Sequence, residues 1–186
     1  MPVSVNNPIT DSVLRAAREA TGANRALLLA IDGESLTVVA ADGDGSSEAV
    51  GVSVDIGQGV AGFVAASGQP VALRPSSADQ RLDDDVARAL GWEPGAVLTV
   101  PCMGMDGISG VLELLDTDRD GGFDFDDVES ATVLAGIAGT VIEEATAGSS
   151  VASPAELHAE LAGLAETDPG RYATVAALVR ALLDVG

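Results

Sequence analysis

The chain has 186 residues and is strongly acidic: 29 aspartates and glutamates face nine basic residues, all arginine, for a net charge of −20. Contacts to phosphates need clustered basic side chains, so we expect neither nucleic acid nor an anionic membrane surface as a partner. The charge itself has two interpretations, either solubility or attraction of a basic partner or of cations. Apolar residues make up 47% of the chain and aromatic ones only 3%, which predicts an aliphatic core.

The surroundings of the protein can be inferred from what the sequence lacks. A single cysteine, Cys102, excludes an intramolecular disulfide and suits a reducing compartment. Residues 1–12 have neither a basic flank nor an apolar run, so no signal peptide is expected. The sequence contains no run of about 18 apolar residues, so no transmembrane helix is expected. We therefore expect a cytoplasmic protein.

The first third of the chain predicts a helix followed by a β-hairpin. Thr10 or Asp11 can cap a helix that runs to residue 20 and ends at Gly22. Its expected apolar side consists of Ile9, Val13, Leu14 and Ala17. The apolar runs 25–31 and 36–41 are joined by an Asp-Gly turn, which is a strong hairpin signal.

The middle of the chain predicts short elements. Residues 50–56 alternate valine or isoleucine with small and polar residues, which is typical of a half-buried strand. A short helix over 59–67 and a brief strand over 71–73 follow. Residues 76–92 are expected to form a loop and a helix whose inward side chains are Val86, Ala89 and Leu90.

Beyond residue 96 the pattern predicts a strand pair and a long helix. The strands cover 97–103 and 110–115, and the first has Leu98, Val100 and Cys102 on one face and Val97, Thr99 and Met103 on the other. The helix covers 126–145. Its apolar stripe, at a spacing of about 3.6 residues, consists of Val128, Ala131, Leu134, Ala138, Val141 and Ile142.

A small, polar linker at 148–153 separates a main domain, residues 1–147, from a C-terminal helical hairpin, residues 154–186. Asp168 is the expected cap of the second helix, with Pro169 in its first turn. The two helices are expected to carry the apolar positions Leu157, Leu161, Leu164, Tyr172, Val175, Val179 and Leu182. A hairpin this small is not stable alone, so it must dock on the main domain or on a second subunit.

The order of motifs between residues 52 and 145 resembles a GAF domain. Gly57, Gly59 and Gly62 form a Gly-x-Gly-x-x-Gly turn that opens the short helix, and Gly68-Gln69-Pro70 stops it. The same glycine spacing occurs in dinucleotide-binding folds, but those need a full crossover helix, which this early stop excludes. Further family-like positions are Asp79 and Arg81, Val100-Pro101 with Gly107, Gly110, Val111 and Leu112, and Gly122-Phe123 with Asp127.

The resemblance implies an α/β fold of the α+β type. A central antiparallel sheet of five or six strands would carry the first helix and the long closing helix on one face. On the other face, the segment 59–92 would cover a ligand pocket. The candidate ligand-binding residues are Ser53, Asp55, Val60, Phe63, Arg74, Asp79, Arg81, Trp92 and Thr99. Arg74, Arg81 and Arg88 cluster in the sequence and could recognise an anionic ligand, and pairing with neighbouring aspartates is the alternative.

Several activities known in the family lack their residues here. Cyclic-nucleotide-binding members carry an Asn-Lys…Phe…Asp-Glu signature, and the matching positions read Asp116-Thr117…Phe123…Asp127-Val128. Free-methionine-sulfoxide reductases need a second cysteine to reduce the sulfenic acid that forms. A haem site needs an axial histidine, and the one histidine, His158, falls in the predicted tail.

Residues 116–127 resemble an EF-hand calcium loop, with aspartates at the first, third and fifth places and glycine at the sixth. The candidate ligands for Ca²⁺ or Mg²⁺ are Asp116, Asp118, Asp120, Asp124 and Asp127. Two departures are an aspartate in place of the twelfth-position glutamate and a preceding strand instead of a helix. The alternative is a helix entry, in which Asp126 or Asp127 caps the helix and Asp124 lies at its positive end.

These observations predict a non-enzymatic signalling or sensor module that binds a small molecule or a partner protein through a GAF-type pocket. As a homodimer, it would respond to a ligand by ordering the segment 59–92 and shifting the helix pair. One alternative is a divalent-cation-binding interaction domain with a filled pocket. Another is a redox enzyme in which Cys102 forms an intermolecular disulfide.

Overall fold

A computed structural model describes residues 8–74, 85–105, 107–150 and 154–183. Six antiparallel strands form one sheet in the order β3-β2-β1-β6-β5-β4. The strands are β1 Ala23–Asp32, β2 Ser35–Gly43, β3 Ser53–Asp55, β4 Val71–Leu73, β5 Val97–Met103 and β6 Ile108–Thr117. The helices are α1 Pro8–Thr21, the 3-10 helix η1 Ser46–Ala49, α2 Gly59–Ser67, α3 Asp85–Ala89, α4 Phe125–Ser150, α5 Pro154–Thr167 and α6 Pro169–Leu183.

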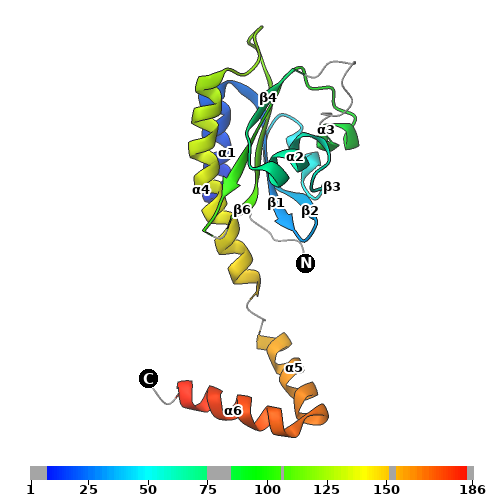
Figure 1. Ribbon diagram of the computed structural model, residues 1–186, viewed down its shortest axis with the longest axis vertical. Coiled ribbons are helices and arrows are strands. Elements are labelled where there is room, and N and C mark those ends of the chain that lie inside the picture. The colour runs from blue at the N-terminus through cyan, green and yellow to red at the C-terminus, as the bar shows by residue number, and fades with distance from the viewer. Residues whose placement is uncertain (1–7, 75–84, 106, 151–153, 184–186) are drawn as a thin grey trace. The chain divides into compact units, whose positions relative to one another are not determined.

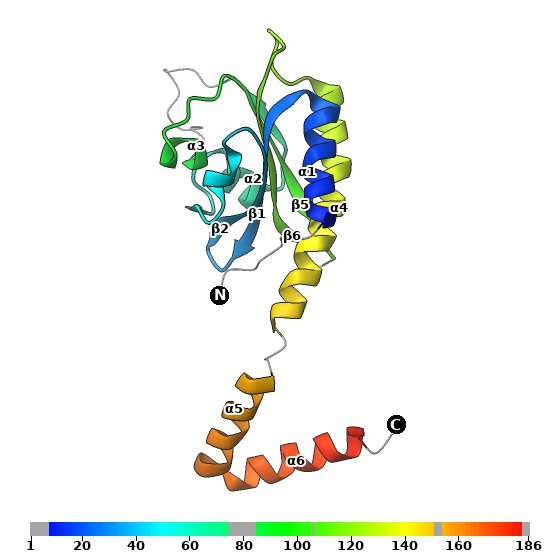
Figure 2. The ribbon, with the colours of Figure 1, turned by 180° about the vertical axis from the view of Figure 1, so that it is seen from behind.

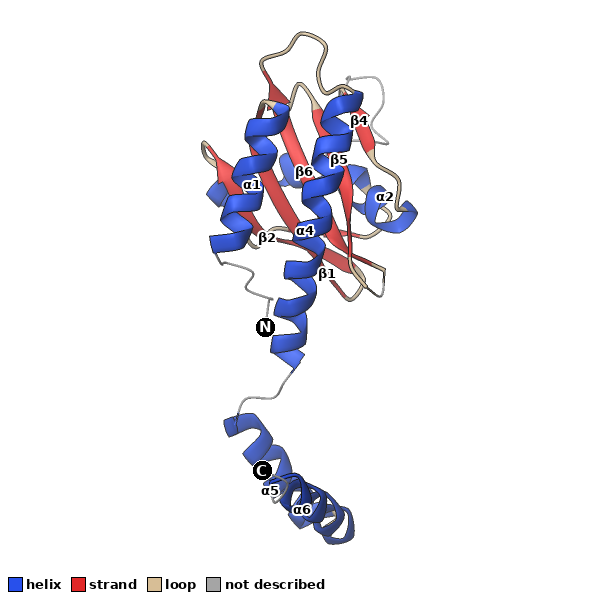
Figure 3. Cartoon of the chain, turned by 90° about the vertical axis from the view of Figure 1, so that its left-hand side faces the viewer, coloured by secondary structure: helices blue, strands red, loops and turns tan. Residues whose placement is uncertain are grey.

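The chain divides into two compact units, Met1–Thr146 and Ala147–Gly186. In the first unit, α1 and α4 lie side by side on one face of the sheet (Figures 1 and 3), while α2 and α3 lie on the other face (Figure 2). This is the predicted antiparallel α+β arrangement. None of the helices in the described part of the chain combines the length and apolarity that a membrane span requires.

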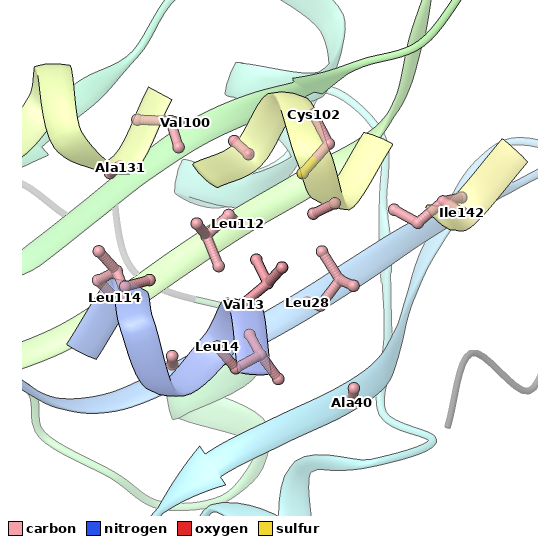
Figure 4. Packing of buried hydrophobic residues seen from close by; sticks show 14 of the residues in the cluster. Val13, Leu14, Leu28, Ala40, Val100, Cys102, Leu112, Leu114, Ala131 and Ile142 are labelled. Carbon is pink, nitrogen blue, oxygen red and sulfur yellow. The ribbon is translucent and has the colours of Figure 1, made fainter. Parts of the chain in front are cut away.

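The central strand β1 is buried on both faces because helices cover both sides of the sheet. Leu28 belongs to the core between the sheet and the pair α1 and α4 (Figure 4). Leu27 and Leu29 point the other way, into the core under α2 and α3. The apolar run in this strand therefore serves two cores. Among the described residues, the fully buried members of both cores include no aromatic side chain, while Phe123 and Trp92 are partly buried and pack against them.

Most of the predicted elements form at the predicted places. The hairpin turn at Gly33, the helix α2 and the strands β4 and β5 have the expected bounds or nearly so. Leu98, Val100 and Cys102 lie in the core beneath α1 and α4, as the alternation in β5 predicts. In the long helix, Ala131, Ala138, Val141 and Ile142 of the predicted stripe are buried.

Three local predictions were wrong. Residues 50–56 form a strand only over β3, because η1 and the positive φ of Gly51 turn the chain first and leave Val50 51% exposed. Ile9 is exposed because α1 begins at Pro8 and turns Thr10 inward in its place. In α3, Ala87 is buried with Val86, while Ala89 faces outward.

In the second unit, α5 and α6 contact each other. The backbone nitrogen of Arg171 donates to the Asp168 carboxylate at 3.0 Å, so Asp168 caps α6 as predicted. The helix before the linker, α4, extends to Ser150 and so includes the first three residues of the predicted linker, 148–150.

Candidate functional site

The glycine-rich turn between β3 and α2 places the first residues of the site. The amide of Gly57 donates to the carbonyl of Gly62 at 2.9 Å, and the amide of Gly62 donates to the carbonyl of Gln58 at 3.1 Å. A Cβ on Gly62 would clash with the Asp55 carbonyl oxygen and lie 2.9 Å from the Gly57 nitrogen. Only glycine lets the helix approach the strand this closely, so the motif serves a tight strand-to-helix turn.

A hollow of about 310 Å³ opens beside this turn, where β3 and the start of α2 meet α3. Two of the predicted ligand residues, Ser53 and Asp55, line it together with residues from all three elements. The described lining residues are Ser53, Val54, Asp55, Gln58, Arg88 and Ala89. Its rim therefore combines a carboxylate, an amide, a hydroxyl and a guanidinium, all of which are open to solvent.

Three of these polar side chains, Ser53, Gln58 and Asp55, make contacts on the rim. The Ser53 hydroxyl lies 2.8 Å from that of Thr37, and the Gln58 amide nitrogen lies 3.4 Å from the Asp55 carboxylate. The described lining of a second hollow, of about 520 Å³, consists of Gly33, Glu34, Asp55 and Ile56. Asp55 therefore lines both hollows.

A buried polar pair lies on the sheet face that α2 and α3 cover. Thr99 and Glu113 are register partners on β5 and β6, and both are completely buried. The Thr99 hydroxyl donates to Glu113 Oε2 at 3.1 Å. A buried carboxylate is costly unless hydrogen bonds compensate, so this pair is a polar point in an otherwise aliphatic layer.

Glu113 was missed by the analysis of the sequence, although a signal for it exists. Val111, Glu113 and Leu115 occupy alternate positions of a strand and so share its face, and both neighbours are buried. One acidic residue in that apolar register marks a buried carboxylate. The hollow residues Gln58 and Ala89 have no such signal.

Other predicted ligand residues take different places. Val60 is a core residue, and Phe63 is 40% exposed on α2 and is not among the residues that line the hollow. Asp79 and Arg81 lie outside the described residues. Arg74 donates a hydrogen bond to the carbonyl of Asp120, which joins it to the aspartate loop, residues 116–127.

Trp92 belongs to a clamp between α3 and β5. The Arg25 guanidinium lies over its ring, 4.6 Å from the centroid, in a cation–π contact. Arg25 also lies 3.3 Å from the Asp116 carboxylate, whose other oxygen accepts from the Gly95 amide at 2.6 Å. The ring of this candidate ligand residue therefore stacks on Arg25.

The aspartate loop is held by Arg119. Its guanidinium donates to Asp127 Oδ2 and to the carbonyl of Thr21, each at 2.5 Å, and lies 3.4 Å from Asp124. The pKa of Arg119 is raised, mainly by the hydrogen bond to Asp127; partial desolvation opposes this, and the charges of Asp127 and Asp124 add to it. An arginine therefore uses two of the five carboxylates that we predicted as metal ligands.

The same two aspartates form a reciprocal cap at the start of α4. The Asp124 amide donates to Asp127 Oδ2 at 2.8 Å, and the Asp127 amide donates to Asp124 Oδ1 at 3.1 Å. This is the capping-box arrangement that satisfies free backbone donors at a helix start. Among the described residues, which include all five aspartates, no three metal-ligating side chains gather as an ion would need.

Cys102 lies on the opposite face of the sheet from the hollow. It is fully buried in the core beneath α1 and α4 (Figure 4), and burial raises the pKa of its thiol far above the ordinary value. A thiol reacts as the thiolate, so this environment makes it inert.

Comparisons with known proteins agree with this geometry. A family model for the GAF domain matches residues 7–142. The match covers most of the chain, so the chain belongs to the GAF domain family, a family of sensor and signalling modules. A comparison with curated proteins finds no match.

Solved structures share the fold at low identity. The GAF domain of an Acinetobacter phosphoenolpyruvate-protein phosphotransferase is 21% identical, with a TM-score of 0.62 over 76% of this chain and 84% of that one. The GAF domain of a Bacillus halodurans two-component sensor histidine kinase is 17% identical, with a TM-score of 0.61 over 76% and 95%. A type II free methionine-R-sulfoxide reductase from Thermoplasma acidophilum is 11% identical, with a TM-score of 0.59 over 73% and 90%.

Proposed function

We propose that this protein is a non-enzymatic regulatory module that binds a small zwitterionic molecule, such as a free amino acid, in the hollow beside β3. The observation that carries the proposal is the lining of that hollow, where Asp55 and Arg88 bring opposite charges to one small open site. Its volume of about 310 Å³ is at the lower end of the range for ligand pockets, which suits a small metabolite.

The chemistry of the rim selects this class of ligand. The Asp55 carboxylate complements an ammonium group, and the Arg88 guanidinium complements a carboxylate in the fork geometry that arginine favours. The Gln58 amide, which also lines the hollow, adds a donor and an acceptor. A purely apolar molecule would use none of these groups.

The state of Cys102 supports a binding role over a redox activity. The Thermoplasma structure is named as a free methionine-R-sulfoxide reductase, so the fold can serve that chemistry. In this chain, however, the one cysteine is buried on the face away from the hollow. The regulatory output would then come from another protein that recognises the liganded state.

A thermal-shift experiment on the full chain tests the proposal. The probes are glycine, L-glutamate, L-methionine and L-methionine sulfoxide, with N-acetyl-methionine methyl ester as the analogue without charges. A ligand at about 100 times its Kd stabilises the native state by ~2.7 kcal/mol, which is a rise in Tm of several degrees. We expect such a rise for at least one zwitterion and none for the ester.

Two variants locate the effect. Asp55→Asn and Arg88→Gln should each abolish the rise, while the control Glu48→Gln, an exposed acid on η1, should keep it. If none of the zwitterions raises the Tm, or if the rise persists in both hollow variants, the proposal is wrong.

A further inference from the structure

The described side chains of the C-terminal hairpin, α5 and α6, form almost no buried core. Among its residues whose side chains are described, 157–177, 179 and 180, none is buried. Leu157, Tyr172 and Val179 are 47%, 38% and 44% exposed. Two short helices that leave their large apolar side chains this open are not stable alone, so another surface must cover them.

The spacing of these side chains is that of a helical bundle. Leu157, Leu161 and Leu164 recur at intervals of four and three residues in α5. Tyr172, Val175 and Val179 recur at intervals of three and four in α6. Alternation of three and four is the seam along which helices pack in coiled coils and four-helix bundles.

The charges of the two helices are opposite. α5 carries three glutamates and no arginine, while α6 carries two arginines, Arg171 and Arg180, and no acidic residue. In a chain with 29 acidic residues, a 15-residue helix free of them stands out. Among the ion pairs of the described residues, none joins α6 to its own α5.

From this juxtaposition we infer that the hairpin is a dimerisation element, which packs against the hairpin of a second copy of the chain to form a four-helix bundle. A two-fold axis would place α5 of one copy against α6 of the other twice, so one set of contacts is used on both sides. The seams would close into a shared core, and the glutamates Glu160 and Glu166 would face arginines of the partner.

A second copy of the hairpin fits better than another acidic or apolar surface. The hairpin supplies both the glutamates and the arginines of the ion pairs, and both apolar seams. It needs no second protein. The inference does not depend on the proposed ligand, since the hairpin and the hollow belong to different units.

The first test is the mass of the full chain in solution. Light scattering should give a dimer of about 37 kDa, twice the chain mass of 18.5 kDa, at protein concentrations from about 1 to 100 µM. Leu157→Glu/Val179→Glu should raise the dimer Kd at least ~100-fold by placing carboxylates in the seams. The control Val133→Glu, at a 66% exposed valine of α4, should leave the dimer intact.

A charge-swap experiment then shows that the contact is between chains. Arg171→Glu/Arg180→Glu makes α6 acidic, and Glu160→Arg/Glu166→Arg makes α5 basic. Each variant alone should dissociate, and an equimolar mixture should recover a heterodimer. A monomeric wild type, a dimer that only Val133→Glu disrupts, or a charge-swapped mixture that remains monomeric would each overturn the inference.

Discussion

Gly62 is the residue where one added methyl group would most disturb the candidate site. Its missing Cβ is what allows α2 to start against the Asp55 carbonyl. Gly62→Ala should therefore lower the free energy of unfolding by about 1–3 kcal/mol, measured by chemical denaturation. Gly136→Ala is the matched control, because nothing lies within 4 Å of its added Cβ in α4; it should stabilise by about 0.5–1 kcal/mol. Equal effects at the two positions would contradict this account of the turn.

Cys102 should make stability depend on alkaline pH. Burial raises the thiol pKa in the folded state, so the unfolded chain loses this proton first as pH rises. Stability contributed by this group is therefore complete below the unfolded pKa, about 8.5, and falls above it by at most ~1.4 kcal/mol per pH unit. Cys102→Ala should remove that decline.

The same burial predicts that iodoacetamide labels Cys102 only as fast as the protein opens. Denaturation curves between pH 7 and 10 for wild type and Cys102→Ala measure the first effect, and labelling rates measure the second. Rapid labelling of the native protein would reopen the redox alternative.

At the scale of elements, the start of α4 depends on Asp127. This side chain caps the helix and accepts from Arg119. Asp127→Ala should cost about 1–2 kcal/mol of stability, whereas Asp126→Ala, at the exposed neighbouring position, should cost a few tenths. Thermal or urea denaturation compares them, and equal losses would remove the capping role.

The aspartate loop should be indifferent to the kind of divalent cation. Arg119 and backbone amides already use the carboxylates of Asp116, Asp124 and Asp127. Chelator-treated protein is compared in Ca²⁺ and in Mg²⁺, each at about 1 mM and at the same ionic strength. Both cations should give the same small rise in Tm, because both only screen the negative charges of the protein. Asp118→Ala/Asp120→Ala should show the same rise. A larger rise for Ca²⁺ that this variant loses would establish the predicted metal site instead.

Elements were predictable where their signals are local. Caps, glycines and apolar spacing lie within a few residues of the helices and strands that they define, as at Gly22, Gly33 and Asp168. Residues 50–56 show the limit: the alternation fits a strand, but η1 and Gly51 turn the chain before it can pair along its whole length. Ile9 failed for a similar reason, since one residue of shift at a helix start changes which side chain faces the core.

At the scale of the whole molecule, the sheet covered on both faces was implied by the resemblance to the GAF family, but the site was not. Ser53 and Asp55 line the hollow as candidate ligand residues, while Arg88 reaches it from α3, a separate element. Likewise, Trp92 and Asp116 share one partner, Arg25, which is far from both in the sequence. Contacts between distant loops depend on tertiary packing, which motif spacing alone does not encode.

The most direct test of the central claim is an amide chemical-shift titration of ¹⁵N-labelled full chain with L-methionine sulfoxide and, separately, with L-glutamate. The account predicts concentration-dependent shifts at Ser53–Gln58 and at Arg88 and Ala89, for at least one probe, that Asp55→Asn abolishes. Saturating additions that leave these amides unmoved, or shifts confined to α1 and α4, would contradict a binding site in the hollow.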